Sequence, residues 1–120
     1  MLFIGNDIAE VRRVCKLIEK KGDAFLNHIF TKNEIEFCST KQHPEIHYTG
    51  RFSAKEAVKK ALLSAKLVRS IPLKQIEITR EIDESPQVNI FAKFEVDITI
   101  KVSISHTDKY ATAVAILEVK

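Results

Sequence analysis

The clearest pattern in the chain is an alternation of apolar and polar residues over positions 96–105. The apolar positions are Val96, Ile98, Ile100, Val102 and Ile104. This period of two is typical of a strand with one face in the core and the other in solvent. After the turn-forming residues 107–109, a run of small and β-branched residues over 110–119 predicts the hairpin partner. His106 falls on the core phase, at the end of the first strand.

A shorter alternation lies between residues 76 and 90. Ile76, Ile78 and Ile82 are separated by polar residues, which predicts another half-buried strand. Residues 83–86 are Asp-Glu-Ser-Pro, a turn composition, and the apolar pattern resumes at 88–90. We therefore expect a second antiparallel pair around this turn.

The longest helical pattern runs from about Ser53 to about Arg69. Its apolar residues recur at spacings of three and four, namely Ala54, Ala57, Val58, Ala61, Leu62 and Ala65. Ser53 and Glu56 have the spacing of a capping box, which predicts that the helix begins at Ser53. Glu56 would then lie in the first turn, with Lys60 one turn later on the same side.

The N-terminal pattern predicts a short strand over residues 1–4, a tight turn at Gly5 and a helix that ends at Gly22. One face of this helix would carry Ile8, Val11, Val14, Cys15 and Ile18. Asp7, with Glu10 three residues on, fits an N-cap pair. The alternative is that Asp7 is a carboxylate exposed at a strand end, where ligands collect.

A further helix is expected after Thr31, because Thr31 and Glu34 repeat the capping-box spacing. Pro44 interrupts the helical pattern, so residues 41–48 are interpreted as a loop. His43 and His47 have the spacing of a metal-binding pair on a helix. Pro44 argues against a helix there, and a surface loop is the favoured interpretation.

The order of these elements predicts an α+β fold. Helices dominate the first half of the chain and contiguous hairpins the second, so we expect an antiparallel sheet packed against the long central helix. A length of 120 residues suits one domain, covering residues 1–120.

Composition adds few constraints. With 45% hydrophobic and 29% charged residues, the chain resembles an ordinary soluble globule, without a membrane-spanning run or a secretory signal, and we expect it in the cytoplasm. A net charge of +3 suits an acidic partner or a phosphorylated substrate and is too small for a nucleic-acid-binding surface. Cys15 and Cys38 lack metal-ligand spacing, so both are expected to be free thiols buried on helices.

The first helix has a basic outer face. Its cations are Arg12, Arg13, Lys16, Lys20 and Lys21, against only two glutamates. Such a face is usually solvated. It could also dock an acidic helix of another protein.

The candidate chemistry consists of two carboxylates at element starts, Asp7 and Glu56, together with Lys60 and His106. Two carboxylates suit a magnesium ion whose remaining ligands include a diphosphate, and a lysine one turn away suits the phosphates. The sequence contains no nucleophile elbow and no glycine-rich phosphate loop. If the protein is an enzyme, the attacking atom is expected to come from a substrate.

Three separated segments resemble a known family. They are residues 4–8 (Ile-Gly-Asn-Asp-Ile), 50–56 (Gly-Arg-Phe-Ser-Ala-Lys-Glu) and 103–106 (Ser-Ile-Ser-His). Together and in this order they resemble the holo-acyl-carrier-protein synthases, the small phosphopantetheinyl transferases. The resemblance implies transfer of the 4′-phosphopantetheine arm of coenzyme A to a serine of apo acyl carrier protein. Adenosine 3′,5′-bisphosphate would be released, and the product would serve fatty acid biosynthesis.

The resemblance also implies roles for individual residues. Asp7 and Glu56 would bind magnesium, and Lys60 would lie by the phosphates as a catalytic and coenzyme A-binding residue. His106 would hold the nucleotide end across a subunit boundary of a homotrimer, and Arg13 would meet the acidic recognition helix of the carrier.

The chain departs from the family after the central helix. Residues 64–67 are Ser-Ala-Lys-Leu where the family has a glycine-containing turn, so we expect the helix to run on longer. Glu84, Ser85 and Pro86 stand where Gly-x-Pro is common. The alternative to an enzyme is a non-catalytic α+β module that binds an acidic protein through the basic first helix, with Asp7 and Glu56 acting only as helix caps.

Overall fold

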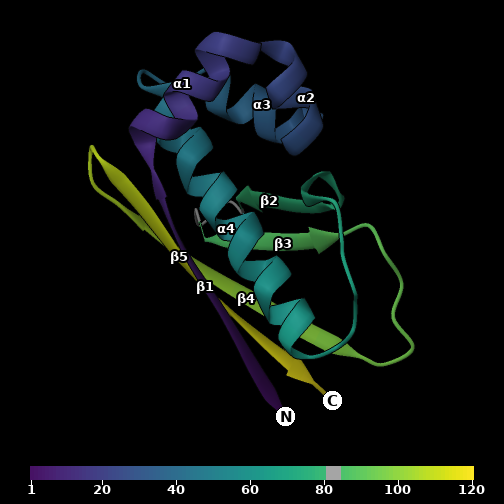
Figure 1. Ribbon diagram of the computed structural model, residues 1–120. Coiled ribbons are helices and arrows are strands. Elements are labelled where there is room, and N and C mark those ends of the chain that lie inside the picture. The colour runs from purple at the N-terminus through teal and green to yellow at the C-terminus, as the bar shows by residue number, and fades with distance from the viewer. Residues whose placement is uncertain (81–84) are drawn as a thin grey trace.

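A computed structural model describes residues 1–80 and 85–120 of the chain (Figure 1). In chain order the elements are β1 (Leu2–Glu10), α1 (Val11–Lys21), α2 (Asp23–Ile29), α3 (Lys32–Ser39), α4 (Pro44–Ser64), a 3-10 turn (Leu73–Gln75), β2 (Ile76–Arg80), β3 (Pro86–Ile90), β4 (Ile98–His106) and β5 (Tyr110–Val119). Helices α1 to α3 gather at one end of the molecule, and α4 runs from them across the sheet (Figure 1). Within the described residues, no helix is long and apolar enough to cross a membrane.

The main sheet has three antiparallel strands in the order β1-β5-β4. The predicted hairpin of β4 and β5 is confirmed, with Ile100 opposite Leu117. Strand β1 joins the other side of β5, and this pairing places the two termini side by side, where the Met1 amino group donates to the Val119 carbonyl at 3.2 Å. The expected antiparallel sheet packed on a long central helix is therefore confirmed.

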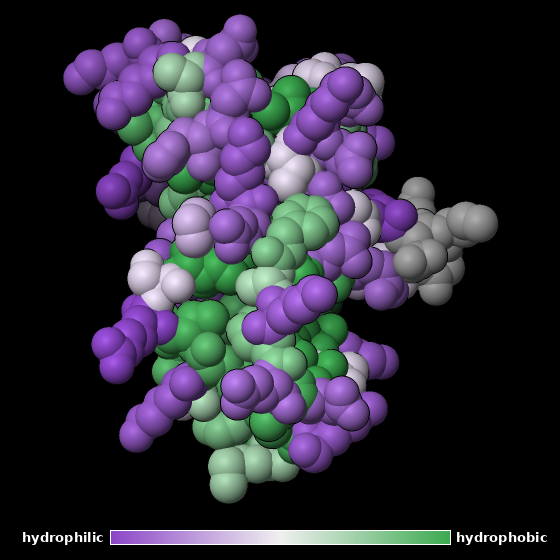
Figure 2. All heavy atoms as spheres, turned by 90° about the vertical axis from the view of Figure 1, so that its right-hand side faces the viewer, coloured by the Kyte–Doolittle hydropathy of each residue, from purple (hydrophilic) through white to green (hydrophobic). Residues whose placement is uncertain are grey.

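A second sheet is formed by β2 and β3, which pair antiparallel with Ile78 opposite Val88. This confirms the pair that the alternation over 76–90 predicts. Ile82, and residues 83 and 84 of the expected turn, lie outside the described residues. In Figure 2 polar side chains cover the helical end, and apolar side chains gather in the lower half, where polar side chains project between them.

The core depends on a close approach between α4 and the main sheet. Small residues line both sides of this contact, namely Ala54, Ala57 and Ala61 on α4 and Ala111, Ala113 and Ala115 on β5. At Gly5 the helix is so close that an added Cβ would overlap the Ala57 carbonyl oxygen. Gly5 is therefore required by packing, and the tight turn predicted there is wrong.

Strand β1 continues through Glu10, and Asp7 lies within it, opposite Ala113. The predicted N-cap role of Asp7 is therefore wrong. Ile8, assigned by spacing to a helical face, is an exposed strand residue. Pairing with β5 overrides the local helical spacing here.

Helix α4 begins at Pro44, nine residues before the predicted start at Ser53. Pro44 occupies the first turn, where its missing N–H costs no hydrogen bond. Ser53 and Glu56 thus lie inside the helix, and their predicted capping box is wrong. The capping box of Thr31 and Glu34 is confirmed at the start of α3.

The end of α4 also differs from the expectation. The helix ends at Ser64, and Lys66 takes a left-handed conformation with φ of 59°. The Lys66 N–H donates to Leu63 O, and the Leu67 N–H donates to Leu62 O. This closing motif usually has glycine at the position of Lys66. A lysine therefore ends the helix where a longer one was predicted.

The two cysteines differ in environment. Cys38 is buried on α3, as expected, and burial raises the pKa of its thiol to about 12. Cys15 on α1 is partly exposed, contrary to the prediction, and its thiol donates to Glu19 at 3.6 Å. Neither thiol has a metal-ligand neighbourhood within the described part of the chain.

Candidate functional site

Asp7 and Glu56 come together in one cleft. Both line a hollow of about 720 Å³, which also contacts Arg13 and Phe52. Strand β1 supplies Asp7, α4 supplies Glu56, and α1 and α2 form the opposite side. The sequence placed the two carboxylates at element starts, whereas the structure places them in element interiors facing a shared space.

Two side chains of α4 hold the strand next to this cleft. The Lys60 ammonium donates to Asn6 O at 2.9 Å and to Asp7 Oδ1 at 3.2 Å. The buried Ser53 hydroxyl donates to Asp7 O at 3.1 Å. Because Glu56 lies between Ser53 and Lys60 on the helix, these contacts fix Asp7 relative to Glu56.

The second oxygen of Asp7 has no hydrogen-bond partner in the described part of the chain. Asp7 Oδ2 is buried and accepts no hydrogen bond from any described residue. A buried carboxylate oxygen left in this state costs free energy unless a ligand satisfies it. A hard divalent cation coordinated by Asp7 and Glu56 would do so.

The protein can supply only part of such a coordination shell. Among the described residues there is no cluster of three or more His, Cys, Asp or Glu side chains that could hold a metal. Magnesium commonly binds through one or two carboxylates and completes its octahedron with water and substrate phosphates. The donor set of this cleft therefore fits magnesium and does not fit a site built wholly from protein ligands.

The same cleft is bordered by the basic face of α1. Arg13 lines it. The cations of this face are Arg12, Arg13, Lys16, Lys20 and Lys21, and none of them forms an ion pair within residues 1–80 and 85–120. An acidic surface docked on α1 would therefore lie directly beside the two carboxylates.

A second group of cations surrounds the ring of Phe37 on α3. The Arg51 guanidinium lies 4.1 Å from the ring centroid, the Lys41 ammonium 4.3 Å and the Arg80 guanidinium 5.6 Å. The His47 ring meets Phe37 edge-on at 6.0 Å. We call these residues the Phe37 cluster.

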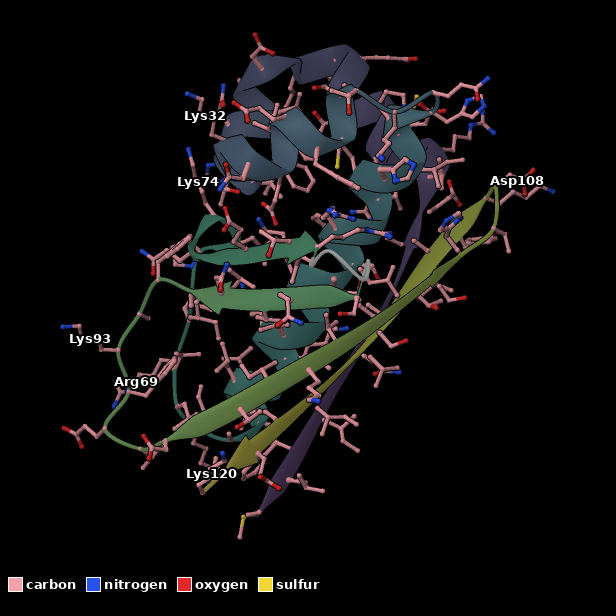
Figure 3. The ribbon with its side chains drawn as sticks, turned by 180° about the vertical axis from the view of Figure 1, so that it is seen from behind. Lys32, Arg69, Lys74, Lys93, Asp108 and Lys120 are labelled. Atoms are coloured by element: carbon pink, nitrogen blue, oxygen red, sulfur yellow. The ribbon has the colours of Figure 1, made fainter. Side chains whose placement is uncertain are left out.

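His106 lies next to this cluster, with its ring centroid 6.5 Å from that of His47. Its place is fixed by the β4–β5 hairpin, whose tip carries Asp108 and lies beside the helical end of the molecule (Figure 3). The Val11 N–H donates to Lys109 O at 2.8 Å and ties this tip to α1.

The electrostatics of the Phe37 cluster favour an anion. Arg51 is only 3% exposed, and its Nε has no hydrogen-bond partner among the described residues. Burial, and then the charges of Arg51, Lys41, His106 and Arg80, hold the pKa of His47 below its usual range. The sequence analysis considered His47 only as part of a metal pair and gave Arg51 no role of its own. Interpreting residues 41–48 as a loop hid the helical spacing that these two residues share on α4.

The cleft and the Phe37 cluster lie on different faces of α4. At 100° per residue, Arg51 and Glu56 are separated by roughly 140° around the helix axis, and His47 and Glu56 by roughly 180°. One bound molecule therefore cannot easily touch both sites on a single chain.

A third polar group is fully buried beneath α3. The Lys55 ammonium pairs with the Glu34 carboxylate, and both side chains are 0% exposed. Glu34 also accepts the N–H groups of Thr31 and Ile78, each at 2.8 Å. Burial lowers the pKa of Lys55, and the neighbouring Glu34 partly offsets this. Sequence reasoning gave Lys55 no role, although the capping box marked Glu34.

Glu77 on β2 extends this buried group. It accepts the Thr31 hydroxyl at 2.6 Å and the amides of Asn33 and Asn89 at 3.3 Å each. The group thus joins α3, α4, β2 and β3. Both oxygens of Glu34 and of Glu77 accept hydrogen bonds, whereas Asp7 Oδ2 accepts none from the described residues.

Comparison with known proteins identifies the family. The model of the 4′-phosphopantetheinyl transferase superfamily matches residues 3–115. The chain is 45% identical over 123 residues to the holo-[acyl-carrier-protein] synthase of Chlamydia muridarum, covering 99% of this chain and 96% of that protein. It is 41% identical over 118 residues to that of Protochlamydia amoebophila, covering 96% of each.

Solved structures agree. The Bacillus anthracis holo-(acyl-carrier-protein) synthase in complex with CoA (3′,5′-ADP) superimposes with a TM-score of 0.80 at 28% identity, covering 98% of this chain and 96% of that one. The Helicobacter pylori holo-[acyl-carrier-protein] synthase in complex with coenzyme A gives 0.78 at 26% identity, covering 98% and 99%. With a family model over nearly its whole length and close relatives of one kind, the chain belongs to the 4′-phosphopantetheinyl transferase superfamily, among the holo-[acyl-carrier-protein] synthases.

Proposed function

We propose that the protein transfers the 4′-phosphopantetheine arm of coenzyme A to a serine of apo acyl carrier protein. Membership of the holo-[acyl-carrier-protein] synthases and structural neighbours bound to coenzyme A support this activity. The observation that carries the site assignment is the buried Asp7 Oδ2, which has no partner within residues 1–80 and 85–120 and lies in the cleft shared with Glu56. We further propose that the reaction is magnesium-dependent, takes place in the cytoplasm and serves fatty acid biosynthesis.

In this proposal Asp7 and Glu56 would hold magnesium beside the diphosphate of coenzyme A. When bound, the ion would supply charge neutralisation and Lewis acidity there. Lys60, anchored on Asn6 O and Asp7 Oδ1, places its ammonium beside the same phosphates and stabilises charge on the leaving group.

The carrier serine supplies the nucleophile, because none of the described residues that line this cleft is a serine, threonine or cysteine. Its oxygen forms a bond to the β-phosphorus, and the bond from that phosphorus to the bridging oxygen breaks. The electron pair leaves with adenosine 3′,5′-bisphosphate, and the serine proton is lost to base. The work of the protein is positioning and charge stabilisation.

His106 and the Phe37 cluster are proposed to bind the nucleotide end of coenzyme A. Their cations suit its phosphate, as does the Nε of Arg51, which has no partner among the residues that the structure describes. Because they lie on a different face of α4 from Glu56, the cluster of one chain would face the Asp7–Glu56 cleft of a neighbouring chain.

A homotrimer with such shared sites is proposed from the resemblance and has support from the surface. The face of the main sheet turned away from α4 exposes large apolar side chains, namely Leu2, Ile4, Ile8, Val114 and Ile116. A contiguous apolar patch of this kind is typical of a surface that is covered in an oligomer.

Arg13 is proposed to receive the acidic recognition helix of the carrier. It is exposed, lies on the basic face of α1 and borders the cleft. A carrier docked there would bring its serine to the diphosphate. Charge at the edge of an interface chiefly sets encounter and orientation.

A mass spectrum of the carrier tests the proposed activity. Apo carrier, coenzyme A and magnesium are incubated with the wild-type protein, with Glu56→Gln, or with Glu95→Gln as a control at an exposed glutamate outside the cleft. The wild type and the control should add a phosphopantetheine mass, and Glu56→Gln should add little. Absence of an adduct on several carriers would favour the alternative, a non-catalytic module that binds an acidic protein through α1.

A further inference from the structure

Phe37 is the centre of the cation cluster and is itself uncharged. Three cations lie within 5.6 Å of its ring centroid, and the edge of His47 lies at 6.0 Å. Like charges gathered in this way repel one another. The negative face of an aromatic ring attracts cations by about 0.5–2 kcal/mol each, so the ring offsets this repulsion.

The ring is held by a rigid support. Helix α3 begins at the Thr31–Glu34 capping box, and Glu34 is clamped by the buried Lys55. Cys38, the neighbour of Phe37, is fully buried against α4. Phe37 is therefore fixed in the fold, whereas the cations that meet it are on long side chains that lose rotamer freedom when ordered.

Arg51 depends most on this support. Its guanidinium lies over Phe37 at 4.1 Å from the ring centroid, its Nε has no hydrogen-bond partner among the described residues, and the residue is only 3% exposed. The ring of Phe37 therefore lies where the carboxylate would lie in an ordinary buried ion pair of an arginine. Unlike a carboxylate, the ring is neutral and leaves the positive charge of the guanidinium uncompensated.

We propose that Phe37 is a positioning residue that orders Arg51, Lys41 and His47 for the phosphate at the nucleotide end of coenzyme A, and that it thereby determines selectivity for the 3′-phosphorylated nucleotide. The inference rests on the proposed function and adds the residue that builds the site. Order present before binding raises affinity because the ligand does not bear the entropic cost of arranging the side chains.

The test compares coenzyme A with 3′-dephospho-coenzyme A in wild type, Phe37→Leu and Phe37→Tyr. Phe37→Leu should raise the KM for coenzyme A about tenfold, in line with one to two cation–π contacts. It should change the KM for the dephospho substrate less than about twofold and leave kcat near normal, since the Asp7–Glu56 cleft is untouched. Phe37→Tyr, which keeps the ring, should behave like wild type.

A second measurement needs neither metal nor carrier. Calorimetry should show adenosine 3′,5′-bisphosphate binding more tightly than adenosine 5′-monophosphate to wild type, with the difference reduced about tenfold in Phe37→Leu. Trifluorophenylalanine at position 37 keeps the shape of the ring while weakening its negative face. It should reproduce the loss even if Phe37→Leu folds poorly.

The possible outcomes distinguish the nucleotide-end site itself from the role of Phe37 within that site. A wild type that does not distinguish the two coenzymes would remove the nucleotide-end site on which the inference rests. A wild type that discriminates, with the same discrimination in Phe37→Leu and in the fluorinated protein, would overturn the role of Phe37 alone. An equal loss for both coenzymes would make Phe37 a structural residue and overturn the inference as well.

Discussion

Two lysine–carboxylate pairs on the same helix lie in opposite environments. Lys55 and Glu34 are both 0% exposed, and further donors satisfy both oxygens of Glu34. Lys60 and Asp7 lie 3.2 Å apart with side chains 51% and 14% exposed, and Asp7 Oδ2 has no partner among the described residues. The first pair is complete, and the second leaves one buried oxygen for a ligand.

This difference indicates how to distinguish charged side chains that stabilise the fold from charged side chains that are available to bind a ligand. A buried ion pair with full hydrogen bonding links elements and has no remaining capacity to bind. A carboxylate with an unsatisfied oxygen beside a cleft is less favourable for the apo fold and is available to a cation. Changes to the two pairs should therefore affect different properties.

The largest effect is expected when the buried pair is broken. Glu34→Gln or Lys55→Met leaves a charge buried without its partner, and either should lower the free energy of unfolding by about 3–5 kcal/mol. Denaturant unfolding measures this loss. A change below about 1 kcal/mol in both variants would mean that the buried pair does not support the fold.

The next effect concerns whether Asp7 acts together with the His106 of its own chain or with that of a neighbouring chain. In a mixed trimer of Asp7→Ala and His106→Ala chains, shared sites would leave one site in three with both residues intact. Mixed trimers can be selected by a different tag on each of the two variant chains. Assayed at a low concentration of coenzyme A, they should recover about a third of the wild-type activity, while trimers of either variant alone are nearly inactive. Activity no greater than that of the parents would contradict shared sites, as would a stable and fully active monomer in sedimentation.

A smaller effect is expected at the edge of the cleft. Arg13→Glu should raise the KM for the carrier about tenfold and the KM for coenzyme A little, because a charge at an interface edge mainly guides the encounter. Lys93→Glu is a matched control, since Lys93 lies in the loop before β4, away from the helical end (Figure 3). Equal effects of Arg13→Glu on both substrates would indicate a structural arginine.

The smallest effect is a pH dependence at His47. Burial and then Arg51, Lys41, His106 and Arg80 lower its pKa in the free protein. A bound phosphate would raise that pKa, so binding should take up a proton, and affinity should fall as the pH rises through the pKa of the bound state. Calorimetry of adenosine 3′,5′-bisphosphate should show an affinity that falls as the pH rises from 6 to 8, and a smaller fall in His47→Asn.

The sequence predicted the parts of the fold that follow from local periodicity. Alternation located the β4–β5 hairpin, and the Thr31–Glu34 spacing located the start of α3. It failed where a longer-range contact decided the outcome. Pairing with β5 extended β1 through Asp7. A local signal was also misinterpreted, because Pro44 occupies the first turn of α4, where proline is favoured, and was expected to break a helix.

The candidate site likewise contains residues that the sequence predicted and residues that only the packing of the fold brings together. Family motifs selected Asp7, Glu56, Lys60 and His106, and the structure brings the first three to one side of α4. The pairing of Lys55 with Glu34, across 21 residues, and the stacking of Arg51 on Phe37 have no local signature. They depend on how α3 packs on α4, which short-range spacing does not encode.

The most direct test of the account measures turnover and unfolding on the same sample of Glu56→Gln. Glutamine has nearly the helix propensity of glutamate, and Glu56 lies in the interior of α4 without a capping role, so stability should change by less than about 1 kcal/mol. Loss of one of two carboxylates should lower magnesium-dependent turnover on the order of 10²-fold, with partial rescue by excess magnesium. Near-normal turnover, or a loss of stability large enough to explain the loss of activity, would contradict the assignment of this cleft as the catalytic site.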